Sequence, residues 1–121
     1  VTGCLIAAFV LMALLVLPGR AFAHAALVAA DPADGSVLMQ SPARFSLTFS
    51  EPVSPLVIAL VRPDGTRLAL TSFRLTDRTV EIDNPETLKS GTHVLSWRVI
   101  SEDGHPVGGS VLFSIGAPSA A

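Results

Sequence analysis

A short stretch near the C-terminal end of the sequence carries two side chains that could bind a metal ion. Ser101–Pro106 reads SEDGHP and places the Asp103 carboxylate two positions before the His105 imidazole. By itself this is an ordinary turn, in which Gly104 allows a positive φ and Pro106 ends the turn. Two ligands hold a metal ion weakly, so the question is whether another part of the chain supplies the remaining ligands.

The N-terminal segment predicts a secretion signal that is removed. Residues 5–17 form an uncharged apolar run, which is shorter than the roughly 20 residues that span a bilayer. Ala21-Phe22-Ala23 follows as a small-x-small cleavage site, so we expect residues 1–23 to be a signal peptide. No Lys or Arg precedes the apolar run, which departs from the usual signal pattern. Cys4 also lies before this run, where a lipidation box does not belong.

Cleavage after Ala23 would make His24 the first residue and create a chelating group. The α-amine and the ring Nδ1 of an N-terminal histidine can bind one metal ion in a six-membered ring. The amine has a reference pKa of about 8, so a metal ion can displace its proton near neutral pH. His24 then offers two nitrogens, His105 a third and Asp103 an oxygen, a planar set that suits Cu(II). Zn(II) prefers a tetrahedron with thiolate or a third histidine, and Cu(I) prefers sulfur, for which only Met39 remains.

Glu51 and His93 are two further residues that could approach a metal ion. Glu51 ends an alternating apolar strand and could supply an extra oxygen or support the ligands from outside, and the sequence leaves this open. His93 lies within another alternating strand, and we expect a surface residue there rather than a ligand.

Short runs with a period of two indicate an all-β domain over residues 24–116. The runs occupy residues 43–51, 56–62, 67–73, 78–83, 92–101 and 110–116, and turn residues separate them. About seven strands are expected, which is the count of an Ig-like antiparallel sandwich. Trp97 is expected in the core, and residues 117–121 are expected to form a flexible tail.

Composition argues against several classes of partner. Removing residues 1–23 takes away Arg20 and no acidic residue, which leaves seven basic residues against ten acidic ones. Nucleic acid and anionic membrane surfaces both need a basic face, so neither is expected as a partner. Cys4 would be lost with the signal, so the domain would contain no disulfide. No general base, nucleophile or nucleotide-binding loop indicates turnover, and we therefore expect a binding protein rather than an enzyme. We also expect a monomer.

Both ends of the region after residue 23 resemble periplasmic copper-resistance proteins of the CopC type. The resemblance rests on HAALVAADPADGSVL, SPARFSLTFSEPV and SGTHVLSWRVISEDGHPVGGSVLFSI. It implies a Greek-key β-barrel or sandwich in the periplasm and a Cu(II) site formed by His24, Asp103 and His105. It places Glu51 at a position that is sometimes drawn into this site. A role in copper sequestration or resistance is also implied, with a CopD-like membrane copper transporter as a partner that could receive the metal.

The sequence departs from the resembling family in two places. Members with a second, Cu(I) site carry a Met-rich loop with a histidine in mid-chain, whereas EPVSPLVIALVRPDGTRLALTSF has neither residue. We therefore expect no Cu(I) site. The usual tyrosine after Gly-Thr is His93 here, and this change alone does not make His93 a ligand.

Two other function classes stay open at this point. One is a copper monooxygenase that uses the N-terminal histidine, although Asp103 would then occupy a copper position that oxygen needs. The other is a metal-free Ig-like interaction module. The chain could also be a piece of a fused protein in which such a domain precedes a copper-transporting membrane region, with GAPSAA as the linker.

Overall fold

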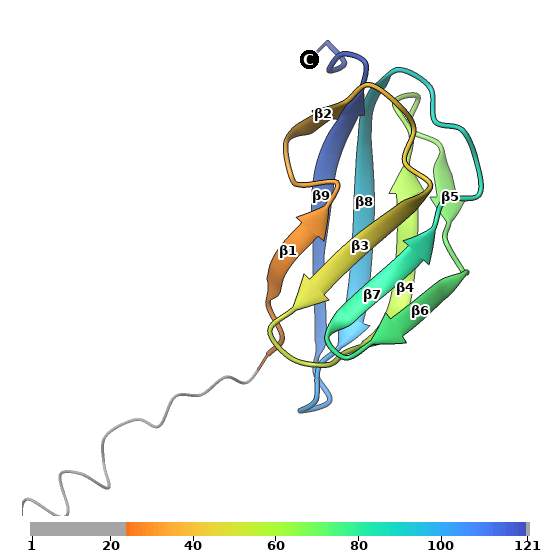
Figure 1. The fold of residues 1–121 in the computed structure, drawn as a ribbon. Coiled ribbons are helices and arrows are strands. Elements are labelled where there is room, and N and C mark those ends of the chain that lie inside the picture. Colours follow the sequence, from red (N-terminus) through yellow and green to blue (C-terminus); the bar gives the residue numbers. More distant parts are fainter. Residues whose placement is uncertain (1–23, 121) are drawn as a thin grey trace, which may run out of the picture.

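A computed structural model describes residues 24–120 of the chain, and the predicted signal peptide lies outside the described residues. Residues 24–120 form two β-sheets packed face to face, with no helix in this range (Figure 1). This part of the chain accordingly contains no helix that is long and apolar enough to cross a membrane. The all-β sandwich predicted from the alternating runs is confirmed.

The two sheets contain four and five strands. The smaller sheet has the order β1-β3-β7-β6, with β1 at Leu27–Asp31, β3 at Arg44–Phe49, β7 at Thr79–Asp83 and β6 at Phe73–Thr76. The larger sheet has the order β2-β9-β8-β4-β5, with β2 at Ser36–Leu38, β9 at Pro106–Ile115, β8 at Gly91–Ile100, β4 at Ser54–Val61 and β5 at Arg67–Ala69. Neighbouring strands pair antiparallel except β2, which runs parallel to β9.

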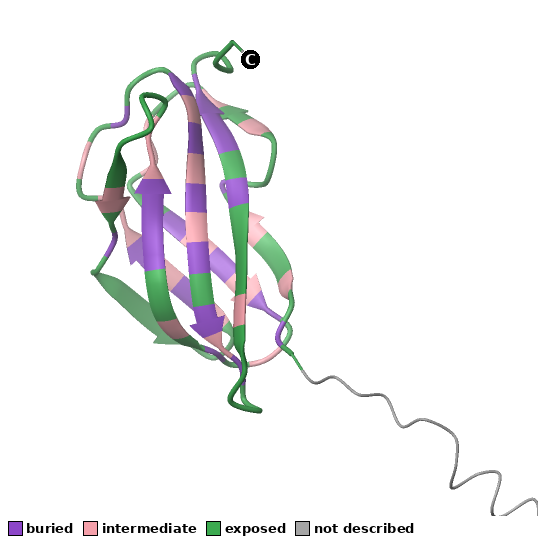
Figure 2. Cartoon of the chain, turned by 180° about the vertical axis from the view of Figure 1, so that it is seen from behind, coloured by how far each residue is buried: buried purple, intermediate pink, exposed green. Residues whose placement is uncertain are grey.

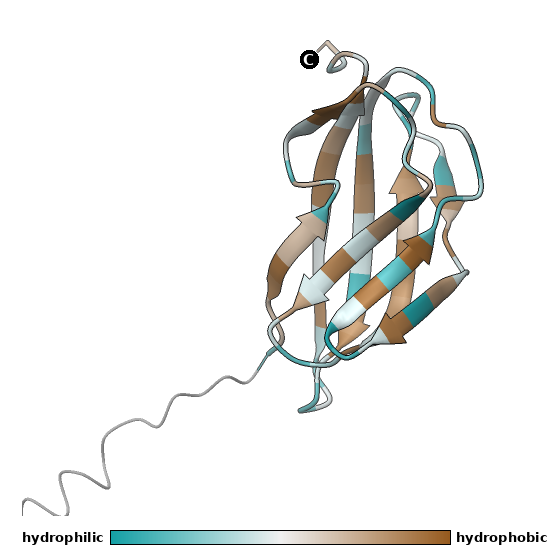
Figure 3. Ribbon diagram, in the orientation of Figure 1, coloured by the Kyte–Doolittle hydropathy of each residue, from teal (hydrophilic) through white to brown (hydrophobic). Residues whose placement is uncertain are grey.

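The core lies between the inner faces of the sheets, where the alternating apolar residues meet. In β3, Phe45, Leu47 and Phe49 are fully buried, while the residues between them are partly exposed. Figure 3 shows this alternation as bands of hydrophobic and hydrophilic residues along β3 and β7, and Figure 2 shows it as buried bands along β8. Trp97 is only 5% exposed, and its ring packs edge-on against Phe49 at a centroid distance of 5.0 Å. Trp97 is therefore confirmed as a core residue.

Some strand boundaries differ from the sequence-based expectation. The described residues contain nine strands rather than about seven, because β1 and β2 are short and pair with strands distant in the sequence. The single strand expected over residues 67–73 is wrong. The chain leaves the larger sheet after Ala69 and joins the smaller sheet at Phe73, with Leu70 buried where it crosses.

The expectation that His93 lies at the surface is also wrong. Its side chain is 1% exposed, and its ring stacks on Phe113 at a centroid distance of 5.5 Å. His93 has the same parity along β8 as Leu95 and Trp97, so all three side chains point into the sandwich. The period of the strand thus decides the direction of the imidazole, although the ring is polar.

The last described residues run back beside the start of β8. The Ser119 N–H donates to Thr92 Oγ1 at 2.9 Å, and Ser119 Oγ accepts from the Thr92 N–H at 2.8 Å. This pair of hydrogen bonds places the C-terminal segment at the end of the sandwich opposite the β8–β9 turn (Figure 1). The flexibility expected for residues 117–121 stays a prediction.

Candidate metal site

The three predicted metal ligands meet at one end of the sandwich. His24 lies just before β1, and Asp103 and His105 lie in the turn between β8 and β9, at the lower end of the molecule in Figure 1. One donor atom from each of the three residues lies within 4.8 Å of the other two. Asp103 Oδ2 is 3.1 Å from His105 Nδ1 and 3.6 Å from His24 Nδ1. The two imidazole rings stand edge to face with their centroids 5.2 Å apart.

The two distances to Asp103 are in the range found between donors of one metal ion. Metal–nitrogen bonds of about 2.0 Å place the donors of one ion roughly 3–4 Å apart. The side chains of His24 and His105 are 55% and 65% exposed, so an ion can enter from solvent without opening the fold. The arrangement can therefore accept and release a cation at the surface.

The β8–β9 turn is held from inside by Ser101, which is 4% exposed. The Ser101 N–H donates to the His105 carbonyl oxygen at 2.9 Å, and the Gly104 N–H donates to the Ser101 carbonyl oxygen at 2.9 Å. Gly104 has a φ of 86°, a conformation that glycine adopts at little cost. The Ser101 hydroxyl contacts both Asp103 Oδ1 and the His105 carbonyl oxygen, and its single proton can go to either. Ser101 thus fixes both ligands relative to one another.

The two oxygens of the Asp103 carboxylate have different partners. Oδ1 faces the Ser101 hydroxyl and accepts from the His105 N–H at 3.2 Å, whereas Oδ2 faces the two imidazoles. The hydrogen bond from Ser101 is the largest cause that lowers the pKa of Asp103 to about 2, with further contributions from the His105 backbone and side chain outweighing partial desolvation. The carboxylate is therefore ionised at neutral pH and releases no proton when a cation binds.

The position of His24 is set by the residues that follow it. Ala25 is buried in the core, and Ala26 exchanges two hydrogen bonds with Ser50 at the end of β3. The Ala26 N–H donates to Ser50 Oγ at 2.9 Å, and the Ser50 N–H donates to the Ala26 carbonyl oxygen at 2.8 Å. This pairing anchors the segment before β1 beside the β8–β9 turn.

Glu51 contacts the site through the backbone of the turn. Its Oε1 accepts from the Glu102 N–H at 3.0 Å, which links the loop after β3 to the β8–β9 turn. The group of donor atoms within 4.8 Å consists of His24, Asp103 and His105. A direct bond from Glu51 to a metal ion stays a prediction.

Ser101 is a residue of this site that the sequence motifs do not reveal. A serine at the end of a strand is common, and its importance here comes from burial beneath the turn. The available signal is its position two residues before Asp103, a spacing at which a hydroxyl can reach the carboxylate.

Comparison with protein families shows to which family this chain belongs. Residues 27–116 match the family described as the CopC domain. The chain belongs to the CopC family. Copper resistance protein C of Xanthomonas campestris pv. juglandis is 30% identical over 105 residues, which cover 78% of this chain and 82% of that protein. Copper transport protein CutJ of Bacillus subtilis is 33% identical over 88% of this chain, but the chain spans only 20% of CutJ.

Two solved structures of copper-related proteins share this fold. CopC from Methylosinus trichosporium OB3b superposes with a TM-score of 0.68 at 28% identity, covering 81% of this chain and 98% of that chain. PcoC from Escherichia coli, described as a methionine-rich copper resistance protein, has a TM-score of 0.62 at 22% identity and covers 76% and 98%. Met39 is the one methionine after residue 23 here, so this CopC-family chain has the fold of PcoC without that composition. The family supports a copper-related function.

Proposed function

We propose that this CopC-family domain binds Cu(II) at the end of the sandwich where His24, Asp103 and His105 meet. The observation that carries the proposal is the convergence of three donor atoms within 4.8 Å from opposite ends of the described chain. Two imidazoles and an ionised carboxylate are donors that can chelate one cation, and this supports the proposal. Copper is the cargo of this site.

Removal of residues 1–23 would complete the ligand set by freeing the α-amine of His24. The six-membered chelate needs the amine and Nδ1 of the same residue, and His24 Nδ1 is the ring nitrogen that faces Asp103 Oδ2 at 3.6 Å. Three nitrogens and one oxygen suit the tetragonal geometry of Cu(II). In the precursor the same nitrogen is an amide, so the site would form only after processing.

Sulfur ligands are far from this site in the described residues. Met39 follows β2 at the opposite end of the sandwich and is strongly exposed (Figure 1). Cu(I) prefers thioether or thiolate ligands, so the nitrogen and oxygen donors favour oxidised copper.

The proposed role is to sequester Cu(II) in the periplasm and to deliver it to a membrane copper transporter. Exposed ligands on a rigid turn suit exchange with a partner, because the metal can leave without unfolding of the domain. The names of the relatives, copper resistance protein and copper transport protein, are compatible with either detoxification or delivery. Binding and transfer, rather than turnover, is the function that this exposed site favours.

The decisive experiment compares two proteins by competitive Cu(II) titration. One begins at His24, and the other carries one additional alanine before His24, which converts the amine into an amide. The extension should weaken Cu(II) binding by at least the roughly 100-fold that loss of a supporting group can cost a metal site. The tetragonal electron paramagnetic resonance spectrum should change in the same variant.

Each other outcome points to a different conclusion. Equal affinity of the two proteins would show that the amine is not a ligand. Failure of both to bind Cu(II) would favour a metal-free interaction module. Oxygen-dependent cleavage of a polysaccharide by the copper-loaded protein would favour a monooxygenase.

A further inference from the structure

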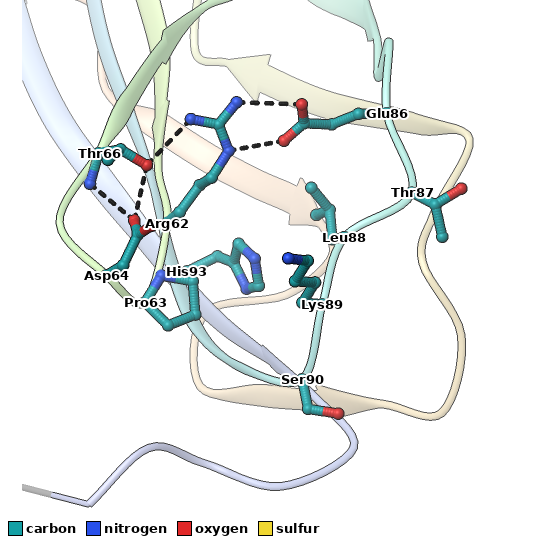
Figure 4. A pocket seen from close by; sticks show the side chains of 10 residues that line it. All are labelled: Arg62, Pro63, Asp64, Thr66, Glu86, Thr87, Leu88, Lys89, Ser90 and His93. Carbon is teal, nitrogen blue, oxygen red and sulfur yellow. Dashed lines mark hydrogen bonds and ion pairs between the residues drawn. The ribbon is translucent and has the colours of Figure 1, made fainter.

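A cavity of about 450 Å³ opens at the end of the sandwich opposite the metal site. The β4–β5 turn forms one wall, and the loop between β7 and β8 forms the other (Figure 4). The ten residues of β8, Gly91–Ile100, connect this cavity to the β8–β9 turn. At about 3.3 Å per residue, the two ends of β8 lie roughly 30 Å apart. The cavity is therefore separate from the site proposed for copper.

The floor of the cavity contains the buried imidazole of His93. His93 Nδ1 lies 3.1 Å from the Gly91 carbonyl oxygen, and a carbonyl can only accept, so Nδ1 carries the proton. Nε2 is then a lone-pair acceptor, and the described residues give it no hydrogen-bond partner. Burial lowers the pKa of His93, which keeps the ring neutral at pH 7. An unused acceptor on a buried ring that lines a cavity is a place for a ligand's donor group.

The rim of the cavity contributes one cation without an ion pair among residues 24–120. Arg62 is engaged by Glu86 through two hydrogen bonds of 2.7 and 3.0 Å, and Glu86 lies within weaker electrostatic reach of Lys89. The Asp64 carboxylate accepts from the backbone N–H and hydroxyl of Thr66. Lys89, which is the single lysine of the sequence, lines the same cavity with its side chain exposed.

The two polar features stand beside apolar walls. Pro63 and Leu88 line the cavity from its two sides, and Figure 4 shows Lys89 and His93 between them. A ligand of complementary chemistry therefore needs an anionic group for the ammonium, a donor for Nε2 and an apolar body. A metal ion does not fit, because the described residues give no third donor near His93.

We infer that this cavity binds a small organic acid that carries a hydroxyl or amino group next to its carboxylate and an apolar body. The carboxylate pairs with the Lys89 ammonium, and the hydroxyl or amino group donates to His93 Nε2. The apolar body packs against Pro63 and Leu88. This binding is independent of the proposed copper function, since the two sites share no residue.

The probe for this inference is mandelate, added to metal-free protein beginning at His24. Phenylacetate lacks the hydroxyl and 1-phenylethane-1,2-diol lacks the carboxylate, so the three compounds separate the two polar contacts. Nuclear magnetic resonance titration should shift the amides of residues 89–93 and the Nε2 resonance of His93. Phenylacetate and the diol should each bind about tenfold more weakly, as expected for loss of a hydrogen bond involving a charged partner or a buried acceptor.

Variants test the assignment of the polar groups. Lys89→Met should weaken mandelate binding about tenfold, while Arg78→Met removes the same charge from the distant β6–β7 turn and should leave binding unchanged. His93→Phe keeps a ring to stack on Phe113 and should abolish the preference for mandelate over phenylacetate. If His93→Phe does not fold, the Lys89 and Arg78 pair still decides the question.

Three results would overturn the inference. The first is the absence of shifts at millimolar mandelate, and the second is the same affinity in Lys89→Met and the unaltered protein. The third is a set of shifts confined to the β8–β9 turn, which would place the acid at the metal site instead.

Discussion

The two ends of the sandwich use histidine in opposite ways. At the metal end, His24 and His105 are more than half exposed, and the Nδ1 atom of each faces the ionised carboxylate of Asp103. At the other end, His93 is buried, its Nδ1 is bonded to a backbone carbonyl and its ring stacks on Phe113. An exposed imidazole can rotate onto a metal ion at little cost, whereas a buried one is part of the packing. Burial and the partner of Nδ1 therefore decide what each histidine can do.

The largest expected effect is a loss of Cu(II) affinity on substitution of His105 but not of His93. His105→Ala removes an exposed ligand and should weaken Cu(II) binding by about 100-fold or more. The free energy of unfolding of the metal-free protein should change by less than about 0.5 kcal/mol, as for other exposed positions. Competitive Cu(II) titration and urea denaturation measure the two quantities. His93→Phe is the matched control and should keep the original Cu(II) affinity, so a similar loss in both variants would break the comparison.

Substitution of the buried His93 is expected to lower stability and to leave Cu(II) affinity unchanged. His93→Ala leaves a cavity beside Phe113 and should destabilise the fold by about 2–3 kcal/mol, as for other large buried side chains. Fluorescence of Trp97, the single tryptophan, reports unfolding in urea. Folded His93→Ala protein should bind Cu(II) as tightly as the unaltered protein. A loss of stability below about 0.5 kcal/mol would mean that the ring contributes nothing to packing.

Ser101→Ala tests whether Cu(II) binding depends on the buried hydroxyl beneath the β8–β9 turn. Loss of the hydroxyl removes the largest cause that lowers the pKa of Asp103 and frees both ligands of the turn. Cu(II) affinity should fall about tenfold, at the low end of the cost of removing a group that orients metal ligands.

The control for this variant lies on the same hairpin at the other end. Ser114→Ala removes a buried hydroxyl that shares a 3.0 Å hydrogen bond with Thr92 and should leave Cu(II) affinity unchanged. Equal losses in Ser101→Ala and Ser114→Ala would assign the effect to general stability rather than to ligand positioning.

The smallest expected effect is a pH dependence that belongs to His93. Burial lowers its pKa in the folded state below the value of about 6.5 in the unfolded chain. Below about pH 6.5 the unfolded chain therefore binds more protons than the folded chain. The contribution of the neutral His93 to the free energy of unfolding is complete above this pH and is lost as the pH falls toward the folded pKa. The loss is at most about 1.4 kcal/mol per pH unit.

Comparison with His93→Phe isolates this contribution. His24 and His105 are present in both proteins, so their protonation cancels from the difference in unfolding free energy. Urea denaturation of the metal-free proteins between about pH 7.5 and 5.5 should show that the unfolding free energy of the unaltered protein falls relative to that of His93→Phe as the pH falls. A constant difference would show that burial does not shift the pKa of His93, and a relative rise would contradict the direction argued from burial.

The sequence predicts the parts of this protein that depend on local pattern or on covalent chemistry. Alternation identifies the buried faces of β3 and β8, because the period of a strand fixes which side chains share a face. The expected ligands His24, Asp103 and His105 do meet, as the processing and chelation argument requires. Whether they bind copper remains the subject of the proposed titration.

The features that escape prediction depend on contacts between distant segments. β1 and β2 are defined by pairing with β3 and β9, and the break between β5 and β6 is a change of sheet that no local pattern encodes. Ser101 orients Asp103 and His105 because it is buried beneath the turn, and its burial depends on the packing of the two sheets. The cavity at His93 is formed by two loops that become neighbours only in the folded chain.

The hydrogen bonds between Ser119 and Thr92 have a practical consequence for attaching this domain to a surface. They hold the C-terminal segment at the end of the sandwich opposite the β8–β9 turn, so a sensor chip or fusion partner coupled after Ser119 would leave the metal end facing outward. The length of β8 would keep that end about 30 Å from the support. An N-terminal tag would instead block the α-amine of His24 that we propose as a ligand, so the direction of immobilisation would decide whether the proposed copper binding can be detected.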